Sequence, residues 1–206
     1  MALVKYNNNS ISAITAASGL SSGAMTLIKS QTASSSSTIS FVDGTSDVVL
    51  DSTYPIYLFK FINIHPSNDG IQLKFNMSID SGSNYNVTKT SSAFSVYHNE
   101  GDSTAEMSYQ ASQDLAQSTS PAFLSLQISN DNDGNCNGYL KLFGVSSTTF
   151  VKHWLSECVD DGGDYSVRFM GGGYGNTTSA VDAIQFSLSA GTMDSGTIKL
   201  YGIKDS

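Results

Sequence analysis

Residues 71–80 read Ile-Gln-Leu-Lys-Phe-Asn-Met-Ser-Ile-Asp, so apolar and polar side chains alternate without interruption. Because successive side chains of a β-strand point to opposite faces, this pattern predicts a strand with one buried face and one face in water. The preceding residues, 65–70, are rich in turn-forming types and include Pro66 and Gly70. The pattern therefore favours a strand of an antiparallel sheet that packs one face on a core.

Strand-like segments continue on both sides of residues 71–80. Residues 56–64 are apolar at both alternating positions, which predicts a strand in the middle of a sheet or in an interface. Residues 25–30 and 38–42 are separated by a serine-rich turn, and we expect these two strands to pair as neighbours. Further short strands are expected at 94–98, 122–128, 139–143, 150–155, 165–170, 183–188 and 197–203.

About ten short strands, separated by Gly, Asn, Asp and Ser clusters, are typical of a sandwich or a barrel. The chain has no internal repeat of fixed period, which argues against propellers and solenoids. The sequence therefore predicts an all-β fold, an antiparallel β-sandwich of jelly-roll-like form. We expect residues 24–206 to form this single domain.

One segment has a helical alternative. Ser103 and Glu106 have the spacing of a capping box, and Met107, Ala111 and Leu115 follow at intervals of four residues. The Thr, Ser and Gln residues around them suit a long loop equally well.

Residues 1–23 differ from the rest of the chain because they are polar, rich in small side chains and without a period that could build a core element. Such a segment is either a floppy terminus or an extended arm that becomes ordered on a partner. We expect an N-terminal attachment arm. Its contacts would come from Leu3, Val4, Tyr6 and Ile11.

The formal net charge is −8, and Arg168 is the only arginine. Because nucleic-acid binding depends on basic side chains that contact phosphates, we expect no nucleic-acid partner. The sequence has no apolar stretch of membrane length and no secretory h-region, so no membrane partner is expected either. Cys136 and Cys158 are far apart and form no metal-binding motif, which favours two buried free thiols over a metal site.

The three histidines lie in no known catalytic motif. His98 has Glu100 and Asp102 nearby, as a base with an orienting carboxylate would need, but polar clusters of this kind are common in turns. His153 shares a strand face with Leu155, which favours a core or interface histidine over a metal ligand. We therefore expect no catalytic residue and no enzyme activity.

Five aspartates lie in two glycine-containing loops, and oxygen-rich turns of this kind can bind calcium. The run 130–134 misses the EF-hand spacing and has no closing glutamate, so no metal and no cofactor are expected. The five are Asp131, Asp133, Asp160, Asp161 and Asp164.

The glycine-rich run 171–175 lacks both the GxGxxG spacing and the lysine of a phosphate-binding loop. It predicts a tight turn or a close approach of the backbone, with Tyr174 exposed at the tip. Tyr165 and Tyr174 are candidates for stacking on a receptor sugar, although single exposed tyrosines are normal on any protein surface.

Residues 183–203 contain a strand, a short glycine-bounded loop and a final strand. This run resembles the closing hairpin of a group of tailed-phage virion proteins, common in phages of marine bacteria and cyanobacteria. Residues 50–57, 114–119 and 146–153 are similar to other recurring segments of that group. The resemblance covers about residues 25–206, and its segments are packing sequences rather than catalytic signatures.

The resemblance implies a non-enzymatic structural component of the virion, either a capsid decoration protein or a head fibre. Such proteins are usually multimeric, most often homotrimers, and their partners are the major capsid protein or other virion proteins. The protein would then be assembled in the cytoplasm of the bacterial host and carried in the virion. The alternative is a tail fibre or adhesin module that binds a host surface glycan. A glycan-degrading enzyme would need an acid/base pair that we do not find in the sequence.

Overall fold

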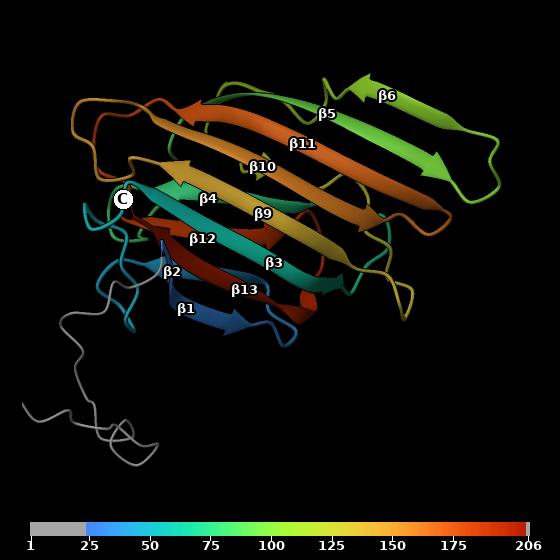
Figure 1. Ribbon diagram of the computed structural model, residues 1–206, viewed down its shortest axis with the longest axis horizontal. Helices are drawn as coiled ribbons and strands as arrows, with labels where there is room; N and C mark the ends of the chain where they lie inside the picture. Colours follow the sequence, from blue (N-terminus) through green and yellow to red (C-terminus); the bar gives the residue numbers. More distant parts are fainter. Residues whose placement is uncertain (1–23, 205–206) are drawn as a thin grey trace, which may run out of the picture.

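The computed structural model describes residues 24–204. Within that range the chain forms thirteen strands and no helix, and the strands make two antiparallel sheets packed face to face (Figure 1). Nine strands belong to the larger sheet and four to the smaller one. The predicted all-β class and antiparallel β-sandwich are therefore confirmed.

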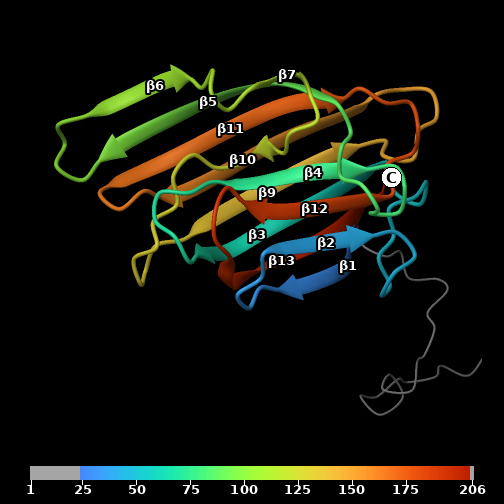
Figure 2. The same cartoon turned by 180° about the vertical axis from the view of Figure 1, so that it is seen from behind.

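The larger sheet extends beyond the smaller one, which packs against one part of it and lies in front in Figure 2. The order in the larger sheet is β1 (Met25–Thr32), β13 (Met193–Ile203), β3 (Ile56–Pro66), β9 (Cys136–Phe143), β10 (Lys152–Asp161), β11 (Tyr165–Gly175), β5 (Lys89–Asn99) and β6 (Ala105–Tyr109), with β7 (Leu115–Ser118) also paired to β5. The order in the smaller sheet is β2 (Thr38–Val42), β12 (Ala183–Leu188), β4 (Leu73–Ser78) and β8 (Ala122–Phe123).

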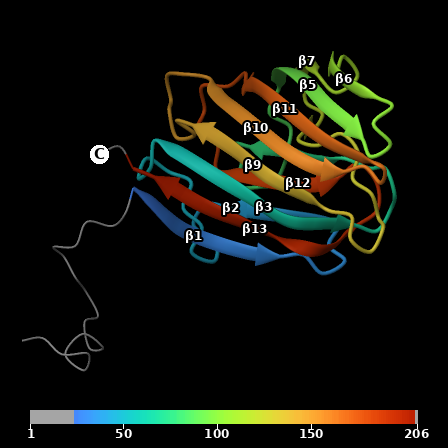
Figure 3. The same ribbon diagram turned by 45° about the vertical axis from the view of Figure 1, so that its right-hand side comes forward.

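The first four strands alternate between the two sheets. Strands β1 and β3 belong to the larger sheet and β2 and β4 to the smaller one, and the last crossing runs from β12 to β13 (Figure 3). This alternation gives the sandwich its jelly-roll-like form. The expectation that residues 25–30 and 38–42 pair as neighbours is wrong, because the serine-rich link carries the chain from one sheet to the other and forms a bridge from Ser36 to Met193 on the way.

Strand β3 lies in the middle of the larger sheet, between β13 and β9, as its doubly apolar pattern predicts. Tyr57, Phe59 and Phe61 are buried on the face toward the smaller sheet. On the opposite face Leu58 is also buried, whereas Ile62 is 37% exposed. The outer face of the central strand is thus only partly covered.

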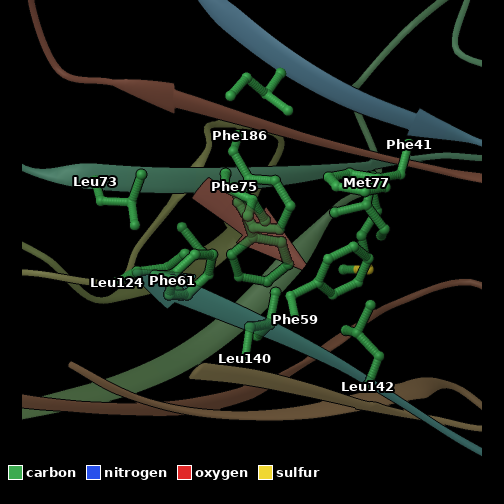
Figure 4. Packing of buried hydrophobic residues seen from close by; sticks show 14 of the residues in the cluster. Phe41, Phe59, Phe61, Leu73, Phe75, Met77, Leu124, Leu140, Leu142 and Phe186 are labelled. Atoms are coloured by element: carbon green, nitrogen blue, oxygen red, sulfur yellow. The ribbon is translucent and has the colours of Figure 1, made fainter. Parts of the chain in front are cut away.

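The core between the sheets combines aliphatic side chains with a group of aromatic rings, several of which meet edge to face (Figure 4). The ring of Phe186 on β12 lies 5.1 Å from that of Phe59 and 5.2 Å from that of Phe61, measured between centroids. Phe75 on β4 meets Trp154 on β10 at 5.1 Å. Each fully buried ring contributes about 1.5 to 3 kcal/mol of transfer free energy, so these contacts hold the two sheets together.

The prediction for residues 71–80 is right only in part, because strand β4 covers Leu73–Ser78 and Ile79, expected on the core face, is 42% exposed. Leu73, Phe75 and Met77 face the core as expected, but Asn76 and Ser78 are buried too instead of facing water. Loops cover that side: the Asn76 side-chain amide donates to the backbone carbonyls of Tyr85 and Thr119 at 2.5 and 2.9 Å.

The helical alternative for residues 103–115 is wrong, because this segment forms β6, a turn and the start of β7. Val96 of β5 pairs with Met107 of β6, and Phe94 pairs with Tyr109. Alternation over Glu106-Met107-Ser108-Tyr109 suits this pairing, and the four-residue spacing of Met107, Ala111 and Leu115 is a coincidence of composition.

The glycine-rich run 171–175 is the end of strand β11 and not a tight turn. Its second predicted role, a close approach of the backbone, is confirmed. A β-carbon on Gly173 would lie 2.3 Å from the carbonyl oxygen of Thr90 and 2.9 Å from the α-carbon of Ser91. The glycine therefore allows β11 and β5 to pair at this point.

Candidate interaction surfaces

Tyr165 and Tyr174 lie at opposite ends of strand β11, nine residues and about 30 Å apart. Tyr165 is 36% exposed and packs edge-on against Tyr97 at 5.8 Å between ring centroids. Tyr174 is half-buried in the strand and lies 6.2 Å from the ring of His153, so its predicted position at a loop tip is wrong. The two tyrosines do not form one site.

His153 is exposed on the outer face of the larger sheet, so its predicted place in the core is wrong. It shares that face with Leu155, as predicted, but the face points away from the smaller sheet. A role in an interface stays a prediction. The arm residues Leu3, Val4, Tyr6 and Ile11 lie outside the described residues.

A polar hollow of about 450 Å³ lies at the end of the larger sheet where β5, β9, β10 and β11 meet. His98 lines it, with its Nε2 atom 3.1 Å from Asp102 Oδ1, but both side chains are mainly in solvent, 55% and 91% exposed. Asn137, Asp161 and Tyr165 also line the hollow. Its wall offers amide, carboxylate and aromatic groups to a polar ligand.

The two aspartate-rich segments meet through backbone hydrogen bonds of Asp161 with Ser129 and Asn135, but their carboxylates do not cluster. Within residues 24–204, three or more His, Cys, Asp or Glu side chains nowhere come together as they would around a metal ion. Asp160 instead points into the sandwich, where its Oδ2 atom accepts hydrogen bonds from the backbone amides of Gln127 (2.7 Å) and Leu126 (3.1 Å). Asp160 therefore fixes the loop that follows β8 to strand β10.

Burial dominates the electrostatics of Asp160. Loss of hydration raises the pKa of its carboxyl to about 7, against the opposing effect of the two backbone hydrogen bonds. Its Oδ1 atom is buried and has no hydrogen-bond partner among the described residues. Folding therefore favours the protonated carboxylic acid at pH values below about 7, where a carboxyl in solvent would be ionised.

Cys136 and Cys158 are buried free thiols, as predicted, on the neighbouring strands β9 and β10. The hydrogen bond between them and their burial raise the pKa of the Cys136 thiol well above its ordinary value. A protonated, buried thiol is a poor nucleophile, so the pair belongs to the core.

Two lysines, Lys89 and Lys152, are buried and flank Gly175 in the larger sheet. The ammonium group of Lys89 donates to Asn76 Oδ1 at 2.5 Å, and that of Lys152 donates to the carbonyl of Phe150 at 2.7 Å. Burial lowers the pKa of Lys89 to about 8. Both lysines satisfy loop acceptors at the end of the sandwich.

The outer face of the larger sheet exposes large apolar side chains at both of its edges. On β1, Met25 is 45% and Leu27 is 51% exposed, and on β6, Met107 is 71% and Tyr109 is 57% exposed. Neither group is predicted by the sequence patterns described above. The alternation over residues 105–109 was the signal available for β6, and a strand interpretation of that segment would have placed Met107 and Tyr109 on one face.

A cluster of lysines lies between these edges on the same face. The ammonium of Lys60 on β3 lies 5.5 Å from the ring centroid of Tyr201, and that of Lys141 on β9 lies 5.2 Å from that of Tyr139. Lys199 pairs directly with Lys60 across β13 and β3. The middle of the face is thus positively charged, although the chain as a whole carries a net charge of −8.

Comparison of the chain with protein-family models, with curated proteins and with solved structures finds no match. In residues 24–204 no helix has the length and apolar character needed to cross a membrane.

Proposed function

We propose that the chain is a non-enzymatic structural protein that acts by burying its surfaces against other proteins of a phage particle. The observation that carries this proposal is the exposure of Met25, Leu27, Met107 and Tyr109 along the two edges of the larger sheet. Exposed sheet edges with apolar side chains invite pairing with another chain, and natural proteins usually protect such edges. A partner that covers them would remove this liability.

The assignment to a phage particle rests on the resemblance of residues 183–203 and the related segments to tailed-phage virion proteins. Within that class we propose a capsid decoration or head-fibre protein, present in the virion as a homotrimer. Residues 1–23, with Leu3, Val4, Tyr6 and Ile11, would attach it to the major capsid protein or to another virion protein. Its mechanism is burial of surface and involves no bond chemistry.

Deletion of residues 2–22 tests this proposal. The shortened protein should keep the far-ultraviolet circular dichroism of a β-rich fold, because none of the thirteen described strands is removed. It should no longer co-purify with particles, whereas a control in which the same residues are replaced by a Gly/Ser segment of equal length should fail in the same way. Incorporation of the shortened protein at the normal copy number would contradict the attachment role.

A second candidate function, a tail fibre or adhesin module that binds a host surface glycan, is favoured by the polar hollow beside Tyr165. An aromatic ring beside amide and carboxylate groups is a common arrangement for holding a sugar. Purified protein should then adsorb to host cells, and Tyr165→Ala should abolish adsorption while Tyr174→Ala, at the other end of β11, should not. Absence of adsorption by the unmodified protein would remove this candidate.

A further inference from the structure

The two edges of the larger sheet are strands β1 and β6, which lie at opposite ends of the strand order (Figure 1). Among the described residues β1 pairs only with β13, and β6 pairs only with β5. The backbone groups on the far side of each strand are therefore available for a further strand.

The outward-facing side chains of the two edges match when β1 is aligned antiparallel to β6. With Leu27 opposite Met107, Met25 falls opposite Tyr109. All four side chains lie on the outer face and are among the most exposed apolar residues of the protein. Cross-strand pairs of large apolar side chains stabilise a sheet, so this alignment would turn two exposed rows into one covered row.

A β-bulge in β1 extends the match to the inner face. The register with β13 shifts between Leu27 and Lys29, so that Lys29 pairs with the buried Leu200 and faces the smaller sheet. Without the bulge Lys29 would share the outer face with Leu27. With it, the same alignment sets Lys29 opposite Glu106.

Glu106 lies on the inner side of β6, because it pairs with Tyr97, which in turn pairs with the buried Val167 of β11. The Tyr97 hydroxyl donates to Glu106 Oε2 at 2.6 Å, which holds the carboxylate in place. Lys29 forms no ion pair within the described residues. An association of β1 with β6 would thus join an ammonium and a carboxylate across the new strand pair.

We propose that copies of this chain associate head to tail, with β1 of one copy pairing antiparallel with β6 of the next. Antiparallel pairing of β6 with β6, centred on Met107, would set Glu106 opposite Ser108 and leave the charges unmatched. Of these two pairings, only that of β1 with β6 brings together both apolar rows and the opposite charges of Lys29 and Glu106. Because the two contact surfaces differ, the association closes into a ring or continues as a fibre.

This inference deepens the proposed multimeric structural role and rests on it. Sedimentation equilibrium of the full-length chain and two charge variants tests the contact. Lys29→Glu and Glu106→Lys should each raise the dissociation constant by about tenfold, since each sets like charges opposite one another. The double variant Lys29→Glu/Glu106→Lys should restore association. Lys141→Glu, on the outer face of the central strand β9, is the control and should leave association unchanged.

Cross-linking locates the contact independently of its strength. In the proposed alignment Thr26 lies opposite Ser108, and the native cysteines are buried, so cysteines introduced at these two positions should react selectively. A mixture of the Thr26→Cys and Ser108→Cys proteins should form a covalent dimer with a bis-maleimide, whereas neither protein alone should do so.

The outcomes separate this inference from the broader proposal. A multimer that is insensitive to both charge reversals, or that cross-links Thr26→Cys to itself, overturns the contact between β1 and β6 and leaves the multimeric role intact. A monomer at all concentrations, including one whose β1 edge is covered by its own residues 1–23, overturns both the contact and the multimer. Association with the charge and cross-linking pattern described above supports both.

Discussion

The two faces of the nine-stranded sheet are made by the same alternating strands, yet they differ in how fully their side chains are covered. On the inner face Phe59 and Phe61 are almost completely buried against the smaller sheet, and Gly173 leaves no space for a methyl group. On the outer face Leu27 and Leu155 are more than half exposed. Alternation therefore tells which side chains share a face, whereas coverage depends on what else packs there.

The largest expected effect comes from removing a ring from the inner core. Phe186→Ala should destabilise the protein by about 3 to 5 kcal/mol, because it deletes the contacts with Phe59 and Phe61 and leaves a cavity. Leu155→Ala on the outer face should cost less than about 0.5 kcal/mol, since that side chain is already in solvent. Urea unfolding of both variants measures the difference. Equal losses would mean that the outer face is covered in solution.

The buried carboxyl of Asp160 on the inner face should make stability depend on pH. The pKa of Asp160 is raised to about 7, so the folded state holds its proton while the unfolded state loses it near pH 4. The stability that comes from this tighter proton binding in the folded state is present below pH 4 and is lost as the pH rises to about 7. Asp160→Asn keeps an acceptor for the amides of Leu126 and Gln127 and cannot titrate.

The free energy of unfolding of the Asp160→Asn variant, relative to that of the unmodified protein, should therefore rise by about 2 to 4 kcal/mol between pH 4 and pH 7. Denaturant unfolding at several pH values measures this difference, and subtracting the two proteins removes the titration of the other carboxylates. A difference that stays constant over this range would show that Asp160 is ionised at little cost.

The glycines of β11 provide a matched pair of substitutions on the two faces. Gly173→Ala should cost about 1 to 3 kcal/mol, because its β-carbon would collide with the backbone of β5 at Thr90 and Ser91. Gly172→Ala meets first the flexible side chain of Leu155, at 3.1 Å, and should change stability by about 0.5 kcal/mol or less. Thermal unfolding of both variants checks the comparison, which fails if the two changes are similar.

A small effect is expected for the ion pair on the outer face. The Nη2 atom of Arg168 lies 2.6 Å from Glu157 Oε1, and the arginine side chain is 53% exposed. Its replacement by alanine should cost about 0.5 kcal/mol, and that cost should fall further in 1 M salt. A loss above about 2 kcal/mol would indicate that the pair is buried by another molecule in solution, which would agree with a covered outer face.

Much of the strand content could be predicted from the sequence, because local alternation is visible at residues 71–80 and apolar continuity at residues 56–64. The coverage of Asn76 could not be predicted, since the carbonyls that accept its hydrogen bonds belong to Tyr85 and Thr119, in loops that only the folded chain brings together. The pairing of β1 with β13 was missed for a similar reason. Neighbours in sequence were expected to be neighbours in the sheet, but the chain changes sheets at Ser36.

The candidate sites were harder to predict than the fold. Tyr174 was expected at a loop tip because a glycine-rich run usually means a turn, whereas these glycines sit inside a strand where two backbones approach closely. The segment of Met107 allows a helix or a long loop by its sequence, and neither alternative places this side chain at the edge of a sheet. A surface becomes visible only when strand order is known, and strand order depends on contacts between distant residues.

The first and last described strands are neighbours, with Met25 paired to Ile203 and the backbone amide of Lys204 donating to the carbonyl of Ala24 at 3.0 Å. The path of the chain therefore returns to the corner where it began. A short linker from residue 204 to residue 24 would close it into a circle, which could be reopened at an exposed turn such as 131–133. Such circular permutants would carry a fused peptide at the opposite end of the sandwich.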